Sequence, residues 1–288
     1  MTDAPHRPVM VDEVVSLLGG AEVVVDMTLG AGGHAKALLD AGVAEIVGVD
    51  RDPDALAIAT ERLAAFGDRV RVVQSRFSEV DEDDVGGQAG GVLFDLGVSS
   101  MQLDEAARGF SYREDAPLDM RMAGDSAGEP SAADLVNGLP ERELADVIYH
   151  FGDERRSRPI AAAIVRNRPI TTTDELAGIV AGAVGRRPGG PHPARRTFQA
   201  LRIAVNRELE ELTASLPHAA RLLVPGGRVV VISYHSLEDG IVKRAFRDDP
   251  GLRVLTKKPM VATDEERAAN PRARSAKLRA AERTEDAA

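Results

Sequence analysis

Short runs of β-branched residues alternate with amphipathic stretches along the first hundred positions of the chain. Runs of this length and composition favour strands rather than helices. Asp52 and Pro53 provide an N-cap and a first helical residue, and Leu56, Ala59 and Leu63 follow them at helical spacing. Strands that alternate with helices predict a parallel sheet covered on both faces. The predicted strands are residues 23–26, 46–50, 70–73 and 92–94.

The pattern changes in the middle of the chain, where residues 105–207 contain no convincing strand. Apolar residues recur every three or four positions from Phe198 to Leu216, which predicts one long helix. A turn into a further strand follows at residues 222–233. Shorter helices are predicted at residues 141–151, 159–165 and 174–184.

These patterns divide the chain into two predicted domains. Residues 1–104 and 208–288 form an α/β domain, and residues 105–207 form an all-helical domain inserted into it. Beyond Lys257 the tail is polar and rich in alanine and arginine, so we expect part of it to be disordered when free.

The composition is ordinary for a globular protein, with 43% hydrophobic and 28% charged residues among 288. No stretch approaches the roughly 18 consecutive apolar residues that a membrane span needs. The first ten residues lack the basic and then apolar pattern of a signal peptide, so we expect a cytoplasmic protein without membrane contact. Cysteine is absent, which excludes a thiolate metal site and is compatible with a reducing compartment. No metal ligands are predicted.

The distribution of charge changes what the net charge of −10 suggests about partners. Residues 1–110 hold 20 acidic against 8 basic residues, a net charge of −12. Residues 155–207 hold 11 arginines and only two acidic residues, a net charge of +9. Phosphate binding needs a local positive patch rather than a net positive charge on the whole protein, so this segment is a candidate nucleic-acid surface. The alternative is that these arginines lie on solvated helix faces. The candidate phosphate contacts are Arg155, Arg156, Arg158, Arg166, Arg168, Arg195 and Arg196.

A glycine-rich segment, residues 26–34, lies between the first predicted strand and the helix after it. Glycines there let the chain turn sharply and let backbone N–H groups approach a ligand. Asp50 ends the second predicted strand and is placed to accept hydrogen bonds from the ribose hydroxyls of an adenosine. The segment also satisfies the looser dinucleotide fingerprint, so NAD and S-adenosylmethionine are both candidate cofactors.

Three features favour S-adenosylmethionine over NAD. Asp26, at the end of the first strand, would attract a cationic ligand but repel a pyrophosphate. Residues 95–100 place polar groups after the fourth strand, where a methyl acceptor would bind. Residues 222–228 resemble the turn before the last strands of methyltransferase sheets.

Several longer motifs make the resemblance specific. They are similar to motifs of the bacterial RsmH/MraW family, methyltransferases of small-subunit ribosomal RNA, and the similarity extends from His6 to Ser275. The motifs are Gly30-Ala31-Gly32-Gly33-His34, Asp50-Arg51-Asp52-Pro53, Asp95-Leu96-Gly97-Val98-Ser99-Ser100, Gly109-Phe110-Ser111, Pro117-Leu118-Asp119-Met120-Arg121-Met122, Arg196-Thr197-Phe198-Gln199-Ala200-Leu201-Arg202-Ile203 and Ser233-Tyr234-His235-Ser236-Leu237-Glu238-Asp239.

The resemblance implies a Rossmann-like methyltransferase sheet with an inserted all-helical domain for substrate recognition. It implies S-adenosylmethionine as cofactor, 16S ribosomal RNA in the small ribosomal subunit as partner, and methylation at N4 of a decoding-centre cytidine as reaction. A homodimer is compatible with the family. Carried over residue by residue, the cofactor contacts are Gly32, Gly33, His34, Asp50, Phe77, Asp95 and Gln102.

The catalytic prediction rests on the weak nucleophilicity of an exocyclic cytosine amine. Acceptors that hold its hydrogens would help the nitrogen pyramidalise and would later take a proton. Ser99 or Ser100, with nearby backbone carbonyls, is the predicted hydrogen-bond acceptor, and His235 is the predicted proton acceptor, although a lone histidine near a strand end is more often structural. Three other interpretations stay open at this point: an NAD-dependent oxidoreductase, an RNA-binding factor without turnover, and a DNA amino-methyltransferase. The last is weakened because residues 95–100 lack the Pro-Pro-aromatic segment of many such enzymes.

Overall fold

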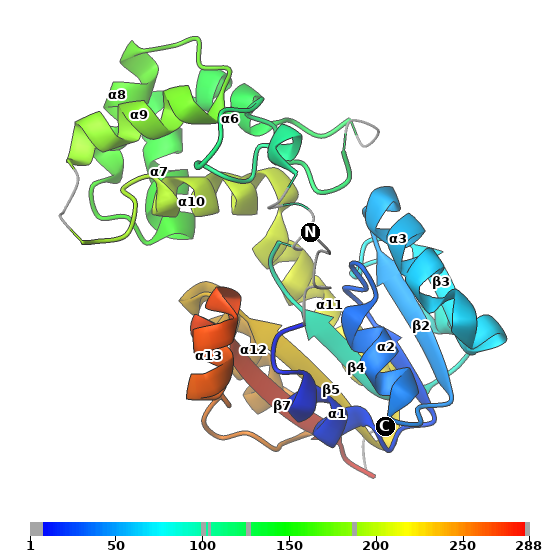
Figure 1. Cartoon of the computed structure of the whole chain (residues 1–288). Helices are drawn as coiled ribbons and strands as arrows, with labels where there is room; N and C mark the ends of the chain where they lie inside the picture. The colour runs from blue at the N-terminus through cyan, green and yellow to red at the C-terminus, as the bar shows by residue number, and fades with distance from the viewer. Residues whose placement is uncertain (1–7, 99–101, 103–104, 125–127, 186–188, 286–288) are drawn as a thin grey trace. The chain divides into compact units, whose positions relative to one another are not determined.

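The computed structural model describes the chain apart from residues 1–7, 99–101, 103–104, 125–127, 186–188 and 286–288. It divides into two compact units, an α/β unit and a helical unit. The α/β unit comprises residues 1–97 and 209–288, and the helical unit comprises residues 98–208. The predicted α/β fold with a helical insertion is therefore confirmed (Figure 1).

The α/β unit is built on a seven-stranded sheet with the order β3-β2-β1-β4-β5-β7-β6. The first five strands in this order are parallel to one another, whereas β7 runs antiparallel to both β5 and β6. The expectation of a parallel sheet thus holds only for these first five strands. The strands are β1 (Val23–Asp26), β2 (Glu45–Asp50), β3 (Val70–Gln74), β4 (Ala89–Asp95), β5 (Leu223–Ser233), β6 (Leu252–Val254) and β7 (Lys277–Arg283).

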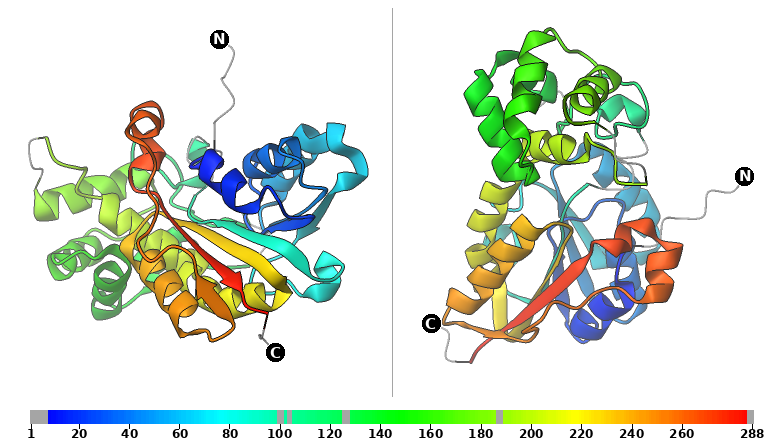
Figure 2. Two further views of the ribbon diagram at one scale, coloured as in Figure 1. Left: turned by 90° about the horizontal axis from the view of Figure 1, so that it is seen from below. Right: turned by 90° about the vertical axis from the view of Figure 1, so that its left-hand side faces the viewer.

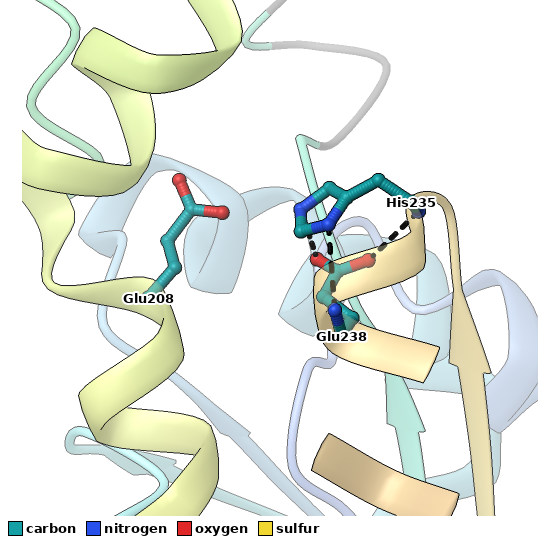
Figure 3. A group of neighbouring side chains, drawn as sticks. All are labelled: Glu208, His235 and Glu238. Carbon is teal, nitrogen blue, oxygen red and sulfur yellow. Dashed lines mark hydrogen bonds and ion pairs between the residues drawn. The ribbon is translucent and has the colours of Figure 1, made fainter. Parts of the chain in front are cut away.

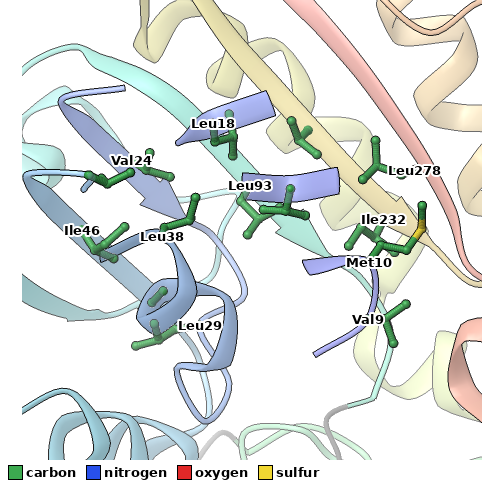
Figure 4. Close-up of a cluster of buried hydrophobic side chains, with 14 of the residues drawn as sticks. Val9, Met10, Leu18, Val24, Leu29, Leu38, Ile46, Leu93, Ile232 and Leu278 are labelled. Atoms are coloured by element: carbon green, nitrogen blue, oxygen red, sulfur yellow. The ribbon is translucent and has the colours of Figure 1, made fainter. Parts of the chain in front are cut away.

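Helices cover both faces of the sheet (Figure 2). Alternate strand residues point to opposite faces, so Val24 belongs to a buried cluster with residues of α1, α2 and α3, while Val25 belongs to another with residues of α4, α11 and α12. Figure 4 shows the first of these clusters, in which Leu18, Leu38 and Leu93 are all buried. The covering helices are α1 (Val11–Leu18), α2 (Gly33–Asp40), α3 (Pro53–Leu63), α4 (Glu82–Val85), α11 (Glu208–Leu222) and α12 (Ser236–Asp248).

The helical unit has a hydrophobic core of its own. Leu144, Ile148, Ile160, Leu176 and Leu201, from four different helices, are all fully buried in it. Its described residues contain no strand, only an isolated bridge, and the three short helices predicted from the sequence are present within two residues at each end. The helices are α6 (Ala132–Gly138), α7 (Glu141–Gly152), α8 (Ser157–Arg166), α9 (Thr173–Val184) and α10 (Arg195–Asn206).

Two expectations from the sequence are wrong. The single long helix from Phe198 to Leu216 is two helices, because Arg207 between α10 and α11 has a left-handed backbone (φ 51°) that ends the first one. The described part of the C-terminal tail, up to residue 285, is ordered: it forms α13 (Asp264–Ala269), a 3₁₀ turn (Pro271–Arg274) and β7, whose Ala280 and Ala281 are fully buried.

None of the helices in the described ranges has both the length and the apolar character needed to cross a membrane.

Candidate cofactor-binding site

The loop between β1 and α2 depends on its glycines. Gly30 and Gly32 have φ of 51° and 75°, a left-handed conformation that strains any residue with a Cβ. Gly33, the first residue of α2, packs so closely on Pro8 that a Cβ would lie 2.4 Å from the proline Cγ. The glycines therefore let the loop turn tightly into the N-terminus of α2, and the N–H groups of Gly30 and Gly32 donate to Asp50 and to the Leu29 carbonyl.

Three carboxylates stand at the carboxyl ends of neighbouring parallel strands. Asp26, Asp50 and Asp95 are the last residues of β1, β2 and β4, and β1 lies between the other two strands. Burial raises the pKa of each carboxyl group above its ordinary value, and raises that of Asp26, which is 1% exposed, to about 7. This edge of the sheet is where open parallel sheets bind ligands.

Asp50 joins the glycine loop to the second strand. Its Oδ2 accepts a hydrogen bond from the backbone N–H of Gly30 at 2.8 Å, and its Oδ1 accepts one from the N–H of Asp52 at 3.0 Å. A carboxylate oxygen can accept more than one hydrogen bond, so both oxygens can also bind ribose hydroxyls.

Asp95 is held from both sides. The Tyr234 hydroxyl donates to its Oδ1 at 2.7 Å, and His34 Nδ1 lies 3.5 Å from its Oδ2. The other ring nitrogen of His34, Nε2, lies 2.9 Å from the backbone carbonyl of Val9. Because a carbonyl can only accept, Nε2 carries the proton of this hydrogen bond.

Tyr234 was not among the residues predicted for the site. It follows directly on β5, the strand next to β4, so it reaches the same edge of the sheet as Asp95. Burial and the neighbouring Asp95 carboxylate raise the pKa of its hydroxyl well above 10, so it remains a donor at neutral pH. Its position directly after a predicted strand was the signal that could have found it.

The other predicted cofactor residues lie in different parts of the chain. Phe77 follows β3 and packs edge to face on Phe94, with ring centroids 5.7 Å apart. Gln102 is buried and belongs to the helical unit. Ser99 and Ser100, the predicted acceptors, lie outside the described residues.

His235 is the N-cap of α12 (Figure 3). Its Nδ1 accepts from the N–H of Glu238 at 3.4 Å, and its Nε2 lies 3.1 Å from Glu238 Oε1. Glu238, 2% exposed, accepts in turn from the backbone N–H groups of Tyr234 and His235. Both ring nitrogens therefore face Glu238, so His235 caps the N-terminus of α12 in addition to its predicted role as proton acceptor.

The seven candidate arginines fall into two groups. Arg156, Arg168 and Arg196 donate to backbone carbonyls at or near helix ends, for example Arg168 to Val136 and Leu139 at 2.6 Å each. Such contacts satisfy carbonyls that lack a helical partner. The side chains of the other four are exposed and make no hydrogen bond or ion pair with described residues; these are Arg155, Arg158, Arg166 and Arg195.

A family model described as the MraW methylase family matches residues 3–284. A protein named ribosomal RNA small subunit methyltransferase H from Methylobacterium sp. (strain 4-46) is 54% identical over 315 residues, covering 99% of this chain and 93% of the relative. A protein of the same name from Nitrobacter winogradskyi is 48% identical, covering 100% of this chain and 94% of the relative. Among solved structures, an rRNA methylase from Streptococcus thermophilus is similar with a TM-score of 0.46 and 11% identity, over 96% of this chain and 94% of that one. The sequence matches span nearly the full length of the chain, and the chain belongs to the MraW methylase family.

Proposed function

We propose that this protein methylates N4 of a cytidine in the decoding centre of 16S ribosomal RNA, with S-adenosylmethionine as methyl donor. The observation that carries the proposal is the identity of about half of all residues, over nearly the full length of both chains, with proteins named ribosomal RNA small subunit methyltransferase H. The family is one of methylases, so the dehydrogenase alternative loses its support.

The residues at the carboxyl edge of the sheet fit this cofactor. Gly32 and Gly33 lack the Cβ atoms that would meet Leu63 and Pro8, which lets the loop after β1 take its course, and Asp50 offers carboxylate oxygens to ribose hydroxyls. The cofactor would supply a methyl group made electrophilic by its sulfonium charge. Gly32, Gly33, His34, Asp50, Phe77, Asp95 and Gln102 are the proposed contacts.

The catalytic roles follow from the chemistry of the acceptor amine. Ser99 and Ser100 are proposed to accept hydrogen bonds from its two hydrogens, which exposes the nitrogen lone pair. His235 is the proposed proton acceptor through Nδ1, whose 3.4 Å contact with the Glu238 N–H is long and weak. Glu238 Oε1, close to Nε2, would stabilise the charged ring.

The helical unit is proposed to recognise the RNA. Its exposed arginines Arg155, Arg158, Arg166 and Arg195 are the proposed phosphate contacts, because their charges are not used within the described residues. Aromatic residues make up only 3% of the chain, so shape and backbone charge are favoured over a row of stacked bases. A cytoplasmic location is part of the proposal, because the proposed substrate is the small ribosomal subunit. A homodimer is a further proposal, which sedimentation of the purified protein tests.

The deciding experiment maps modified nucleotides on small subunits from a strain that lacks this protein. We expect one decoding-centre cytidine to lose its N4-methyl group and to regain it when the purified protein and S-adenosylmethionine are added. A methylation map identical to that of the parent strain would refute the proposed function.

A further inference from the structure

The turn that follows β3 carries Phe77, the proposed contact of the adenine ring. In the sheet, Asp50 pairs with Gln74, the last residue of β3, and the backbone N–H of Ser75 donates to the Asp50 carbonyl at 3.1 Å. Phe77, three residues beyond Gln74, therefore follows β3 at the same carboxyl edge as the proposed ribose acceptor. Its ring is half-buried and packs edge to face on Phe94. A ring in this place keeps part of its surface accessible to a flat ligand group such as a purine.

Glu211 on α11 binds the side chains on either side of Phe77. Its Oε1 accepts from Arg76 Nη1 at 3.1 Å, and its Oε2 accepts from the Ser78 hydroxyl. The two contacts span 135 and 133 positions of the chain. The Glu211 side chain is 14% exposed, so water and salt screen its ion pair with Arg76 less than they screen a surface pair. One carboxylate therefore anchors both residues that flank the ring.

The anchor comes from outside the turn. The backbone N–H of Glu79 donates to the Arg76 carbonyl at 3.0 Å, which closes the turn but does not connect it to another element. Glu211 makes that connection from a helix packed on the sheet. The next residue of this helix, Leu212, is buried in the cluster against which Phe77 packs. The position of the Phe77 ring thus depends on a residue of α11.

We propose that Glu211 is a positioning residue for adenine binding, because it fixes the turn at residues 76–78 and with it the Phe77 ring. The inference rests on the proposed function. Glu211 acts through Phe77 rather than on the cofactor itself. Loss of its carboxylate lets the ring leave its place, which lowers the affinity for the cofactor but leaves methyl transfer from the bound cofactor unchanged.

The test is a double-mutant cycle of Glu211→Ala and Phe77→Ala, measured as the dissociation constant of S-adenosylmethionine by isothermal titration calorimetry. We expect each single variant to weaken binding about fivefold to tenfold. Residues that act through the same ring are not additive, so the double variant should bind within about twofold of Phe77→Ala alone. A general loss of packing would instead multiply the two effects.

Two further measurements separate positioning from stability. In methyl transfer to small ribosomal subunits, Glu211→Ala should raise the KM for S-adenosylmethionine about fivefold to tenfold and leave kcat within about twofold of the parent. Glu211→Gln should restore most of the affinity, because its amide oxygen can accept from Arg76 and its amide nitrogen can donate to the Ser78 hydroxyl. Glu79→Ala, at an exposed position of the same turn, is the matched control and should change the affinity by less than about twofold.

Three results overturn the inference. One is a Glu211→Ala variant that binds S-adenosylmethionine as tightly as the parent. Another is an equal loss from Glu211→Ala with and without the Phe77 ring, which shows that the carboxylate acts elsewhere. The third is a Phe77→Ala variant with the affinity of the parent. Absence of any affinity of the parent protein for S-adenosylmethionine is a different result, because it refutes the proposed function itself.

Discussion

Asp50 accepts a hydrogen bond from the backbone N–H of Gly30, twenty positions earlier in the chain, at 2.8 Å. The contact fixes the left-handed glycine turn after β1 to the end of β2, so the loop and the carboxylate form one unit before any ligand arrives. A preorganised site loses less entropy on binding than one that must order its loop.

Removal of this carboxylate should therefore weaken cofactor binding in two ways. Asp50→Ala frees the loop and deletes the proposed ribose acceptor. We expect the dissociation constant of S-adenosylmethionine to rise between about tenfold and a hundredfold, as measured by calorimetry. Asp54→Asn, four residues further at the start of α3, is the comparison and should change the affinity by less than about twofold. An unchanged affinity in Asp50→Ala would contradict the role given to the carboxylate.

Gly33→Ala should destabilise the protein through a steric clash. The new Cβ would lie 2.4 Å from Pro8 Cγ, so the N-terminal segment must move. We expect a loss of about 1–3 kcal/mol in the free energy of unfolding, measured by urea denaturation. Gly20→Ala is the control, because nothing lies within 4 Å of the position that its Cβ would take and its φ is negative. Replacement of Pro8 by glycine in the Gly33→Ala background should restore most of the loss; failure to do so would show that the clash lies elsewhere.

Asp26 should lower the stability of the ligand-free protein as pH rises. Its pKa is near 4 in the unfolded chain and about 7 in the folded one, so between these values only the folded state keeps the proton. The contribution of the Asp26 carboxyl group to the free energy of unfolding is therefore lost as the pH rises from 4 to 7. We expect Asp26→Asn to match the parent near pH 4 and to exceed it increasingly up to pH 7. Above pH 7 the gain should level off at a few kcal/mol, at most about 4.

Denaturant unfolding of both proteins at pH 4, 5.5, 7 and 8 measures this difference. A gain that is independent of pH would mean that the substitution acts through packing rather than through charge.

The two groups of arginines should respond differently to substitution. The double variant Arg155→Ala, Arg158→Ala should weaken RNA binding. It should also reduce the slope of a plot of the logarithm of the binding constant against the logarithm of the salt concentration by roughly 2, about one per lost phosphate contact. Arg168→Ala should leave that slope unchanged but lower stability by about 1–3 kcal/mol, because two helix-end carbonyls lose their donor. Filter binding at several salt concentrations separates the cases, and equal slopes for all variants would argue against the proposed RNA surface.

Much of the fold was predictable because local patterns agree with it. Val24 and Val25 alternate between faces, and Asp52 with Pro53 begins α3 as expected. The C-terminal strand could not be predicted in this way. Its buried core is short and alanine-rich between charged residues, and its Arg279 is buried only because it pairs with Asp239 at 2.7 Å, a contact 40 positions apart.

The site was also predictable in part. The glycines and strand-end acids carry recognisable spacing, so Gly32, Asp50 and Asp95 lie at the expected edge of the sheet. The link between Tyr234 and Asp95 depends on β5 lying beside β4, and more than a hundred residues of insertion separate these strands in the chain. Pairing across such an insertion is a property of the folded sheet rather than of any local pattern.

The placement of β7 between β5 and β6 has a consequence for synthesis. In the described sheet β6 pairs with β7 alone, so this edge cannot assemble until β7 has left the ribosome. Until then a nascent chain carries an open edge on β5, and a stop codon before β7 would remove an interior strand of the sheet.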